Sequence, residues 1–387
     1  MASIDRTSTG WRARWRTPEG ASRSRNFRRK VDAERFLTKI EASKLDAAYV
    51  DPSAGRVTFG AFAADWLASQ TFDPSTREAV ASRLRVHLLP AFGGLEVRNI
   101  RPSMVQAWLR DRQERAAPRY VRVMLANLSA IFGAAVEDGL IARNPCAARS
   151  VRAPAVEQDR VVPWTLDQVA GVVAAHPTRW RALPVVAAGC GLRQGEVFGL
   201  RVEDIDFLRH RILVRQQVKL LAGHPTIAPP KGRKTREVPL PDVVAGVLAE
   251  HLRATPTIDG LVFTSRERKL VNRNYFNRHV WKPALRAAGV GPTRANGMHA
   301  LRHFYASVQL EAGTSVRALA EYLGHADPGF TLRVYTHLMP SSESRARQAV
   351  DQALADALEA APCVTPVSRG GLRGAKPQLS GLPAQMS

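Results

Sequence analysis

The sequence contains little cysteine and no apolar run long enough to cross a bilayer. Its cysteines, Cys146, Cys190 and Cys363, are widely spaced along 387 residues and form no Cys-x-x-Cys pair. This spacing argues against a disulfide framework or a zinc site and fits a reducing compartment. The longest apolar stretch, residues 182–192, is too short for a transmembrane helix. The N-terminus is polar and basic, without the apolar segment of a signal peptide, so we expect a cytoplasmic protein.

Acidic residues are also in short supply. The chain has 34 Asp and Glu against 56 Lys and Arg, a net charge of +22. Such an excess is typical of proteins that bind a polyanion, and nucleic acid is the default partner. A membrane surface is the competing interpretation, but the basic residues are spread over every segment and form no long basic amphipathic helix. The length of the chain predicts two or three domains.

Residues 1–50 are predicted to form a small basic unit. Aromatic and basic residues alternate over residues 11–15, which is a strand pattern, and residues 23–27 form a second strand after a Pro-Glu-Gly turn. A helix capped by Asp32 follows. A β-ribbon with arginines on one face can lie in a DNA groove, and the alternative is a hairpin that only keeps the chain soluble. The candidate DNA contacts on this ribbon are Arg12, Arg14 and Arg25.

A helical bundle is predicted for residues 57–145, after a short linker at 51–55. Amphipathic helical patterns with polar connections begin at four places in this segment. These starts are Thr58, Pro74, Pro102 and Pro118. Arg119 and Arg122 are expected on exposed faces, where they either contact DNA phosphates or remain solvated surface charges. Weak periodicity over residues 146–162 predicts an extended linker.

A larger α+β domain is predicted for residues 163–350. Helices are expected to flank three strands in this domain. These strands are residues 209–218, 223–228 and 236–240. An apolar stripe predicts a last helix that continues through residues 351–360 and packs either on a neighbouring subunit or on its own domain. Residues 361–387 are rich in Gly, Pro and Ser, and a disordered tail is expected there.

Six side chains at the edges of the predicted elements carry groups that can hold and attack a phosphodiester without a metal. They are Arg193, Lys231, His299, Arg302, His325 and Tyr335. Arg193 follows a Gly-Cys-Gly turn at the start of a helix, where a guanidinium and backbone amides can bind phosphate oxygens, and Glu196 is placed to orient it. Lys231 belongs to a basic turn with Arg233 and Lys234, which either reaches the DNA backbone or is only solvated.

The other four of these side chains follow one another closely. His299 and Arg302 are spaced to share one face of a helix. His325 comes directly after the glycine that ends the next helix, and Tyr335 lies in the helix after that. A single histidine at a helix end is usually structural. The complete set of cations, imidazoles and a phenol is hard to explain in that way.

The catalytic stretch resembles a known family. Its motifs, in order and spacing, resemble those of the tyrosine recombinase (phage integrase) family, and the resemblance covers nearly the whole chain. It implies a multidomain, mainly α-helical fold with small β-sheets. The parts would be an arm-binding β-ribbon with a helix, a helical core-binding bundle of the SAM-like kind, and an α+β catalytic domain. The basic turn resembles the family's β-hairpin that ends in Val-Pro-Leu240, which favours Lys231 over Lys234 as the catalytic lysine.

The resemblance also implies a mechanism. Tyr335 would attack the scissile phosphate, giving a 3′-phosphotyrosyl link and a free 5′-hydroxyl. Arg193 and Arg302 would neutralise the charge on the phosphorane, and Lys231 would protonate the leaving oxygen. The first histidine of the set would take or position the tyrosine proton, and the second would hydrogen-bond a non-bridging oxygen. No cofactor is implied, because the covalent link keeps the bond energy.

The implied partners are double-stranded DNA at attachment sites, a homotetramer on that DNA, and an accessory DNA-bending or directionality protein. A topoisomerase of the same chemistry and a chromosome-dimer resolvase are both disfavoured by the arm-like residues 1–50. The sequence therefore predicts an integrase of a phage or integrative mobile element. The alternative is a DNA-binding regulator that keeps the fold and has lost the chemistry, although no catalytic position is missing.

Overall fold

The computed structural model describes residues 2–18, 20–45, 51, 54–156 and 161–338, with a few positions between 347 and 355. Buried side chains form separate hydrophobic cores in three segments of the chain. These segments are residues 4–40, 57–151 and 164–322. Most of the predicted last helix and the whole predicted tail, residues 361–387, lie outside the described residues.

The N-terminal unit is an antiparallel three-stranded sheet in the order β1-β2-β3, packed on one helix. Its elements are β1 (Ser3–Thr7), β2 (Gly10–Arg16), β3 (Ser22–Phe27) and α1 (Lys30–Leu45). Ala13 and Trp15 of β2 are buried against Leu37 and Ile40 of α1. The sequence analysis missed β1, and it placed the start of α1 at a cap on Asp32, two residues inside the observed helix.

The strand register corrects the prediction that the three candidate arginines share one face. Ala13 and Trp15 point into the core, so Arg12 and Arg14, which alternate with them, lie on the opposite face. Arg25 pairs directly with Ala13 and therefore lies on the face that α1 covers. Its guanidinium sits 5.4 Å from the ring centroids of both Phe27 and Phe36, a cation–π arrangement.

The central unit is a bundle whose helices begin where the sequence analysis expected. The Thr58 hydroxyl accepts a hydrogen bond from the Ala61 amide, and Asp73 caps the helix that starts at Pro74. A π-helical turn, Leu84–Leu88, joins α3 to α4. The helices are α2 (Phe59–Ser69), α3 (Pro74–Arg83), α4 (Leu89–Phe92), α5 (Pro102–Arg115) and α6 (Pro118–Glu137). Proline is the first residue of α3, α5 and α6, where it costs no hydrogen bond because the first amides of a helix have no helical partner.

Helix α6 is long and apolar enough to span a membrane by length and composition alone. Its apolar side chains, however, include Met124, Leu128 and Phe132, which are fully buried in the bundle core. The hydropathy of α6 is therefore that of a central core helix.

The bundle extends further than expected. Cys146 and Val151 pack on its core, and the Arg122 guanidinium donates a hydrogen bond to the Pro154 carbonyl at 3.1 Å. The first part of residues 146–162, predicted as an extended linker, therefore packs on the bundle. Residues 157–160 lie outside the described residues.

The C-terminal unit, which corresponds to the predicted catalytic domain and is called the catalytic unit below, contains one three-stranded sheet and one separate hairpin. The sheet is formed by β4 (Ile205–Asp206), β5 (Arg211–Val214) and β8 (Arg236–Pro239), and the hairpin by β6 (Gln217–Leu221) and β7 (His224–Ala228). The predicted strand at 209–218 is therefore two strands in different sheets. β7 does not pair with β8, so the basic residues 229–235 form a loop between the sheets and not the turn of a hairpin.

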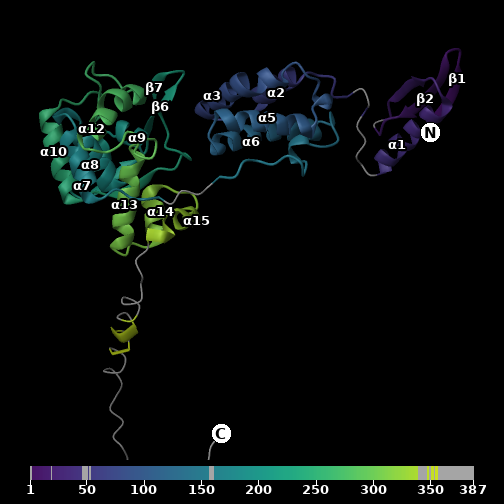
Figure 1. The fold of residues 1–387 in the computed structure, drawn as a ribbon. Coiled ribbons are helices and arrows are strands. Elements are labelled where there is room, and N and C mark those ends of the chain that lie inside the picture. The colour runs from purple at the N-terminus through teal and green to yellow at the C-terminus, as the bar shows by residue number, and fades with distance from the viewer. Residues whose placement is uncertain are drawn as a thin grey trace, which may run out of the picture. The chain divides into compact units, whose positions relative to one another are not determined.

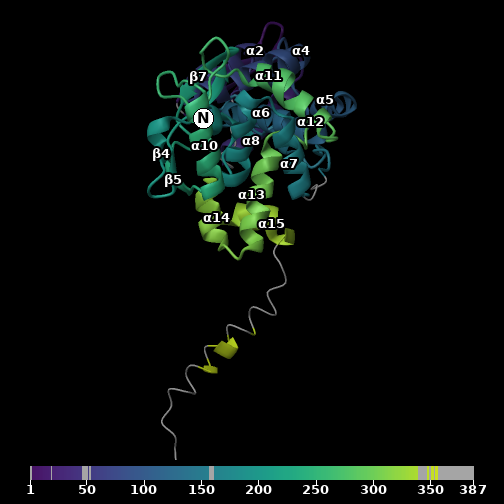
Figure 2. The same cartoon turned by 90° about the vertical axis from the view of Figure 1, so that its left-hand side faces the viewer.

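Helices surround these strands. They include α7 (Leu166–Ala175), α8 (Thr178–Cys190), α9 (Gln194–Phe198), α10 (Asp242–Ala254), α11 (Arg273–Phe276) and α12 (Lys282–Ala287). Three further helices are α13 (His299–Glu311), α14 (Val316–Leu323) and α15 (Pro328–Tyr335). α13 contacts α8 and α14, and α14 lies beside α15 (Figures 1 and 2). This packing brings together the start of α9, the face of α13 that carries Arg302, and the turn after α14.

Candidate active site

A glycine turn at the end of α8 positions Arg193 and Arg302. Gly191 has a φ of 62°, and a Cβ atom there would lie 2.4 Å from a ring carbon of Tyr305. Only glycine fits this left-handed, closely packed position. The turn directs the Gly191 carbonyl to Nη1 of Arg302, which donates to it at 2.8 Å, and Arg193 begins α9 two residues later.

Glu196 binds two arginines from inside the protein. Its carboxylate accepts from Nη1 of Arg193 at 2.8 Å and from Arg236, whose Nη1 and Nη2 donate at 3.0 and 2.7 Å. Glu196 is 1% exposed. Burial opposes its ionisation, but the hydrogen bonds and charges of Arg236 and Arg193 outweigh burial and lower the pKa of Glu196 to about 2. The orienting role expected of Glu196 thus has a geometric basis, whereas the sequence analysis missed Arg236.

Arg236 links α9 to the turn that carries His325. Its Nε donates to the Tyr322 carbonyl at 2.7 Å, while Nη2 of Arg193 donates to the Gly324 carbonyl at 3.1 Å. Gly324 ends α14 with a φ of 61° and lies against the Arg236 side chain. One buried carboxylate and two arginines therefore fix the position of this turn.

Gly324→Ala is expected to lower the free energy of unfolding by about 1–2 kcal/mol, because a non-glycine residue is strained in the left-handed region. The added Cβ would also lie 3.0 Å from Cδ of Arg236. Urea unfolding of the whole chain measures the change. Gly246→Ala is the matched control: this glycine lies within α10 with open space around it, so alanine should stabilise the helix. Equal stability of Gly324→Ala and the unaltered chain would contradict the strain.

Arg302 is almost completely buried, with 1% of its surface exposed. Its Nη2 donates to the Leu323 carbonyl and to Nε2 of His325, the latter at 3.0 Å. Its Nε has no partner within the described part of the chain. Burial and the charge of Arg193 lower the pKa of Arg302 to about 9, so the guanidinium is still charged at neutral pH.

The hydrogen bonds of His325 determine its tautomer. Arginine can only donate, so Nε2 of His325 accepts from Arg302, and the ring proton is on Nδ1. Nδ1 lies 2.7 Å from the Thr331 hydroxyl and donates to it. Partial burial and the charges of Arg302 and Arg193 lower the pKa of His325 to about 3, so the ring is neutral.

His299 stands at the first turn of α13, close to the cations. Partial desolvation, followed by the charges of Arg302, Arg193 and Lys231, lowers the pKa of His299 to about 4. Lys231 itself is exposed on the loop after β7, together with Arg233 and Lys234. The loop thus brings a flexible cation near the cluster without a hydrogen bond to it.

Tyr335 ends α15 and is 2% exposed. Its hydroxyl lies 2.8 Å from Nδ1 of His303, a residue that the sequence analysis did not select. The available signal was the spacing of His303, one helical turn after His299. Burial raises the pKa of Tyr335 to about 12, partly offset by the charge of Arg302.

The predicted DNA contacts outside the cluster have different surroundings. Arg119 is exposed at the start of α6, and Arg122 is exposed but bonded to the Pro154 carbonyl. Arg12 donates to the Asn26 side chain at 3.1 Å, and Arg14 pairs with Asp5 at 2.9 Å. Three of these four arginines already have protein partners, which DNA phosphates would have to replace or share.

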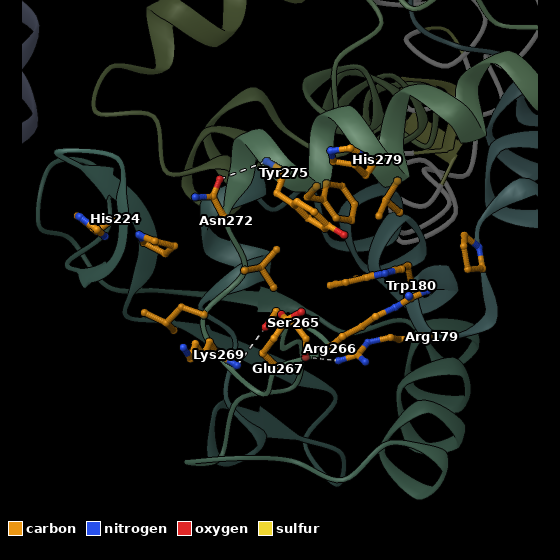
Figure 3. A pocket seen from close by; sticks show the side chains of 16 residues that line it. Arg179, Trp180, His224, Ser265, Arg266, Glu267, Lys269, Asn272, Tyr275 and His279 are labelled. Atoms are coloured by element: carbon orange, nitrogen blue, oxygen red, sulfur yellow. Dashed lines mark hydrogen bonds between the residues drawn. The ribbon is translucent and has the colours of Figure 1, made fainter.

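A cavity of about 720 Å³ lies elsewhere in the catalytic unit (Figure 3). Tyr275 and His279 flank it with ring centroids 4.6 Å apart, and Arg179, which also lines the cavity, donates to the Ser265 carbonyl. Asn272 caps the helix that carries Tyr275. None of the six predicted catalytic residues lines this cavity. The groups suited to phosphate chemistry therefore belong to the cluster around Arg302.

Comparison with known families agrees with this geometry. Residues 165–341 match the phage integrase family, and residues 59–151 match the phage integrase central domain. The chain belongs to the phage integrase family. It is a tyrosine recombinase, and all six predicted catalytic positions fall within the matched segment.

Curated relatives of this integrase extend over most of the chain. It is 28% identical over 342 residues to the prophage phiRv2 integrase of Mycobacterium tuberculosis, covering 84% of this chain and 88% of the relative. It is 25% identical over 335 residues to the integrase of Mycobacterium phage FRAT1, covering 83% and 94%.

Solved integrase structures share its fold. The Tn1549 transposon integrase in complex with transposon right end DNA has a TM-score of 0.64 at 20% identity and covers 76% of this chain and 99% of that one. A lambda integrase tetramer bound to a Holliday junction has a TM-score of 0.58 at 17% identity and covers 87% and 94%.

Proposed function

We propose that this integrase cuts and rejoins DNA through Tyr335, forming a covalent 3′-phosphotyrosyl intermediate. The observation that carries the proposal is the convergence of Arg193, Arg302, His299 and His325 beside the turn and helix that lead to Tyr335. A phenol is a poor nucleophile at neutral pH, since the pKa of Tyr335 is about 12. An active site that uses this phenol must therefore supply positive charge for the phosphate and a group that accepts the proton of the phenol.

Arg193 and Arg302 are the proposed phosphate ligands. Among the described residues Arg193 forms a salt bridge with Glu196, which is shared with Arg236, and Arg302 forms none, so an anion between Arg193 and Arg302 is favoured. Donors aimed at developing charge are typically worth about 3–4 kcal/mol each. In the described structure Nη1 and Nη2 of Arg302 are bonded to two carbonyls and His325, whereas Nε has no partner among the described residues and is a donor left for a phosphate oxygen.

The histidines have separate proposed roles. His299 is neutral at pH 7, because its pKa is about 4, and it can accept a hydrogen bond or a proton from the phenol. His325 is proposed to hydrogen-bond a non-bridging phosphate oxygen. For this Nε2 must carry a proton, which requires the other tautomer or a protonated ring together with the loss of its bond to Arg302, because Nε2 is an acceptor in the present arrangement.

Three successive segments of the chain have separate proposed roles. Residues 1–50 would bind arm-type DNA, residues 57–145 core DNA, and residues 163–350 would carry out the chemistry. We propose double-stranded attachment sites as the substrate, a tetramer as the active assembly, an accessory bending or directionality protein, no cofactor and a cytoplasmic location. The phage or mobile-element setting is supported by the prophage and phage relatives.

The test of the chemistry uses duplexes taken from sequence flanking the gene, each nicked beside the presumed cut. The nicked fragment diffuses away, which traps the intermediate. A denaturant-resistant protein–DNA band is expected, with protein on the 3′ end and a free 5′-hydroxyl on the released fragment. Tight, sequence-specific binding without a band on any of these duplexes would favour the DNA-binding regulator, and a 5′ attachment would contradict the proposed polarity.

Lys231 is proposed as the general acid, and Lys231→Ala is expected to slow covalent complex formation by roughly 10²–10⁴-fold. A duplex with sulfur in place of the bridging 5′-oxygen should restore the rate, because a thiolate leaves without protonation. Lys234→Ala is the matched control on the same loop and should lower only salt-sensitive DNA affinity. Rescue of Lys234→Ala instead would reassign the acid to Lys234.

A further inference from the structure

His303 connects two groups of the proposed chemistry. It stands one turn after His299 on α13, and the two imidazole rings meet edge to face with centroids 4.6 Å apart. The His303 ring also meets the Tyr335 ring in a T-shaped contact at 5.6 Å, and its Nδ1 lies 2.8 Å from the Tyr335 hydroxyl. The order in space is therefore His299, His303, Tyr335.

The hydrogen bond between His303 and Tyr335 does more than give a buried phenol hydroxyl a partner. The same helix carries Tyr305, whose buried hydroxyl has no partner within the described residues. The fold thus tolerates an unpaired tyrosine hydroxyl two positions away from His303. At Tyr335, in contrast, a titratable side chain is provided on the neighbouring helix at hydrogen-bond distance.

We propose that His303 is a positioning residue for strand cleavage, holding the Tyr335 hydroxyl through Nδ1 at a fixed place beside His299. The proposal rests on the proposed role of Tyr335 as nucleophile. The hydrogen bond fixes the oxygen, and the T-shaped contact fixes the plane of the phenol ring. Reaction rates are sensitive to such placement: a misplacement of about 1 Å can cost on the order of 10²-fold.

The state of the imidazole suits this role. Partial burial and the neighbouring His299 and Arg302 lower the pKa of His303 to about 4, so the ring is neutral at pH 7. A neutral ring with its proton on Nδ1 donates to the phenol oxygen and can go on donating to the phenolate. In this tautomer His303 remains a partner of the oxygen before and after the phenol gives its proton to another group.

The test is a set of substitutions at His303 that differ in the place of the polar atom. In Asn the amide atoms are bonded to Cγ, as Nδ1 is in histidine, whereas the polar atoms of Gln stand one bond further out, like Nε2. Covalent complex formation would be timed on the nicked duplex at saturating DNA for His303→Ala, His303→Gln and His303→Asn. DNA affinity and thermal unfolding of the full chain are measured beside it.

We expect His303→Ala and His303→Gln to slow covalent complex formation by roughly 10–100-fold at unchanged DNA affinity. His303→Asn should remain within a few-fold of the unaltered chain. A rate unchanged in His303→Ala would overturn the proposal. A rate in His303→Asn as slow as that of His303→Ala would also overturn the proposal. Asparagine restores the hydrogen bond but cannot take a proton, so such a result would show that holding the hydroxyl is not sufficient.

Failure of this inference is distinguishable from failure of the proposed function. If Tyr335→Phe still forms the covalent complex, the nucleophile is elsewhere and both proposals fall. If Tyr335→Phe abolishes the complex while His303→Ala leaves its rate unchanged, the nucleophile stands and only the positioning role is lost.

Discussion

Tyr335→Phe is expected to form no covalent complex with DNA while it binds DNA as tightly as the unaltered chain. Removing a covalent nucleophile commonly costs roughly four to six orders of magnitude in rate, which takes the product below detection. The substitution removes one oxygen and leaves the buried ring in place, so stability should fall by only about 1 kcal/mol for the lost hydrogen bond to His303. The measurement is the denaturant-resistant band on the nicked duplex.

Tyr305→Phe is the matched control for this substitution. Tyr305 is also a buried tyrosine of the catalytic unit, but its hydroxyl bonds to nothing in the described part of the chain. Its removal should leave covalent complex formation intact. Persistence of the complex in Tyr335→Phe would move the nucleophile to another tyrosine, and Tyr322, the residue before the Leu-Gly-His turn, would be tested next.

Glu196→Gln is expected to lower the free energy of unfolding by about 3 kcal/mol at pH 7, because it leaves two arginines without their buried counter-charge. The folded pKa of Glu196 is about 2, below the ordinary value of 4.5. A depressed carboxyl pKa contributes stability above pH 4.5 and loses it as the pH falls towards 2. The stability difference between the two proteins should therefore shrink through this acidic range.

Covalent complex formation by Glu196→Gln should also be slow, since Glu196 orients Arg193 and, through Arg236, the turn that leads to His325. Urea unfolding between pH 7 and 3 and the nicked-duplex assay measure the two effects. Glu237→Gln is the matched control, because Glu237 pairs with Arg211 at an exposed site, where a salt bridge contributes at most about 1 kcal/mol. If the stability difference between Glu196→Gln and the unaltered chain did not change with pH, it could not come from the ionised Glu196 carboxylate.

The helix starts and the catalytic motifs were readable in the sequence because their signals are local. Thr58, Asp73 and the prolines at the first turns mark helix starts through backbone chemistry within a few residues. The glycines before Arg193 and His325 reveal left-handed turns in the same way. These signals, with the order of the motifs, predicted the mainly helical fold, the family and the recombinase activity.

The pairing of the strands was harder to predict from the sequence. Residues 209–218 have a continuous strand pattern, yet β5 pairs with β8 and β6 pairs with β7. Arg25 was grouped with Arg12 and Arg14 for the same reason: an alternating pattern defines two faces, but the register defines which face is covered. Pairing partners are chosen by contacts between residues distant in sequence, and these leave no local pattern.

The chemical groups of the site and their order can be read from the amino-acid sequence, whereas the contacts between them arise from long-range packing. Glu196 and Arg236 are 40 residues apart, and His303 and Tyr335 are 32 apart. Arg302 reaches across to Gly191 and His325 in the same way. Such contacts depend on helix packing around a shared core, and packing is specified by the whole set of buried side chains and not by any short motif.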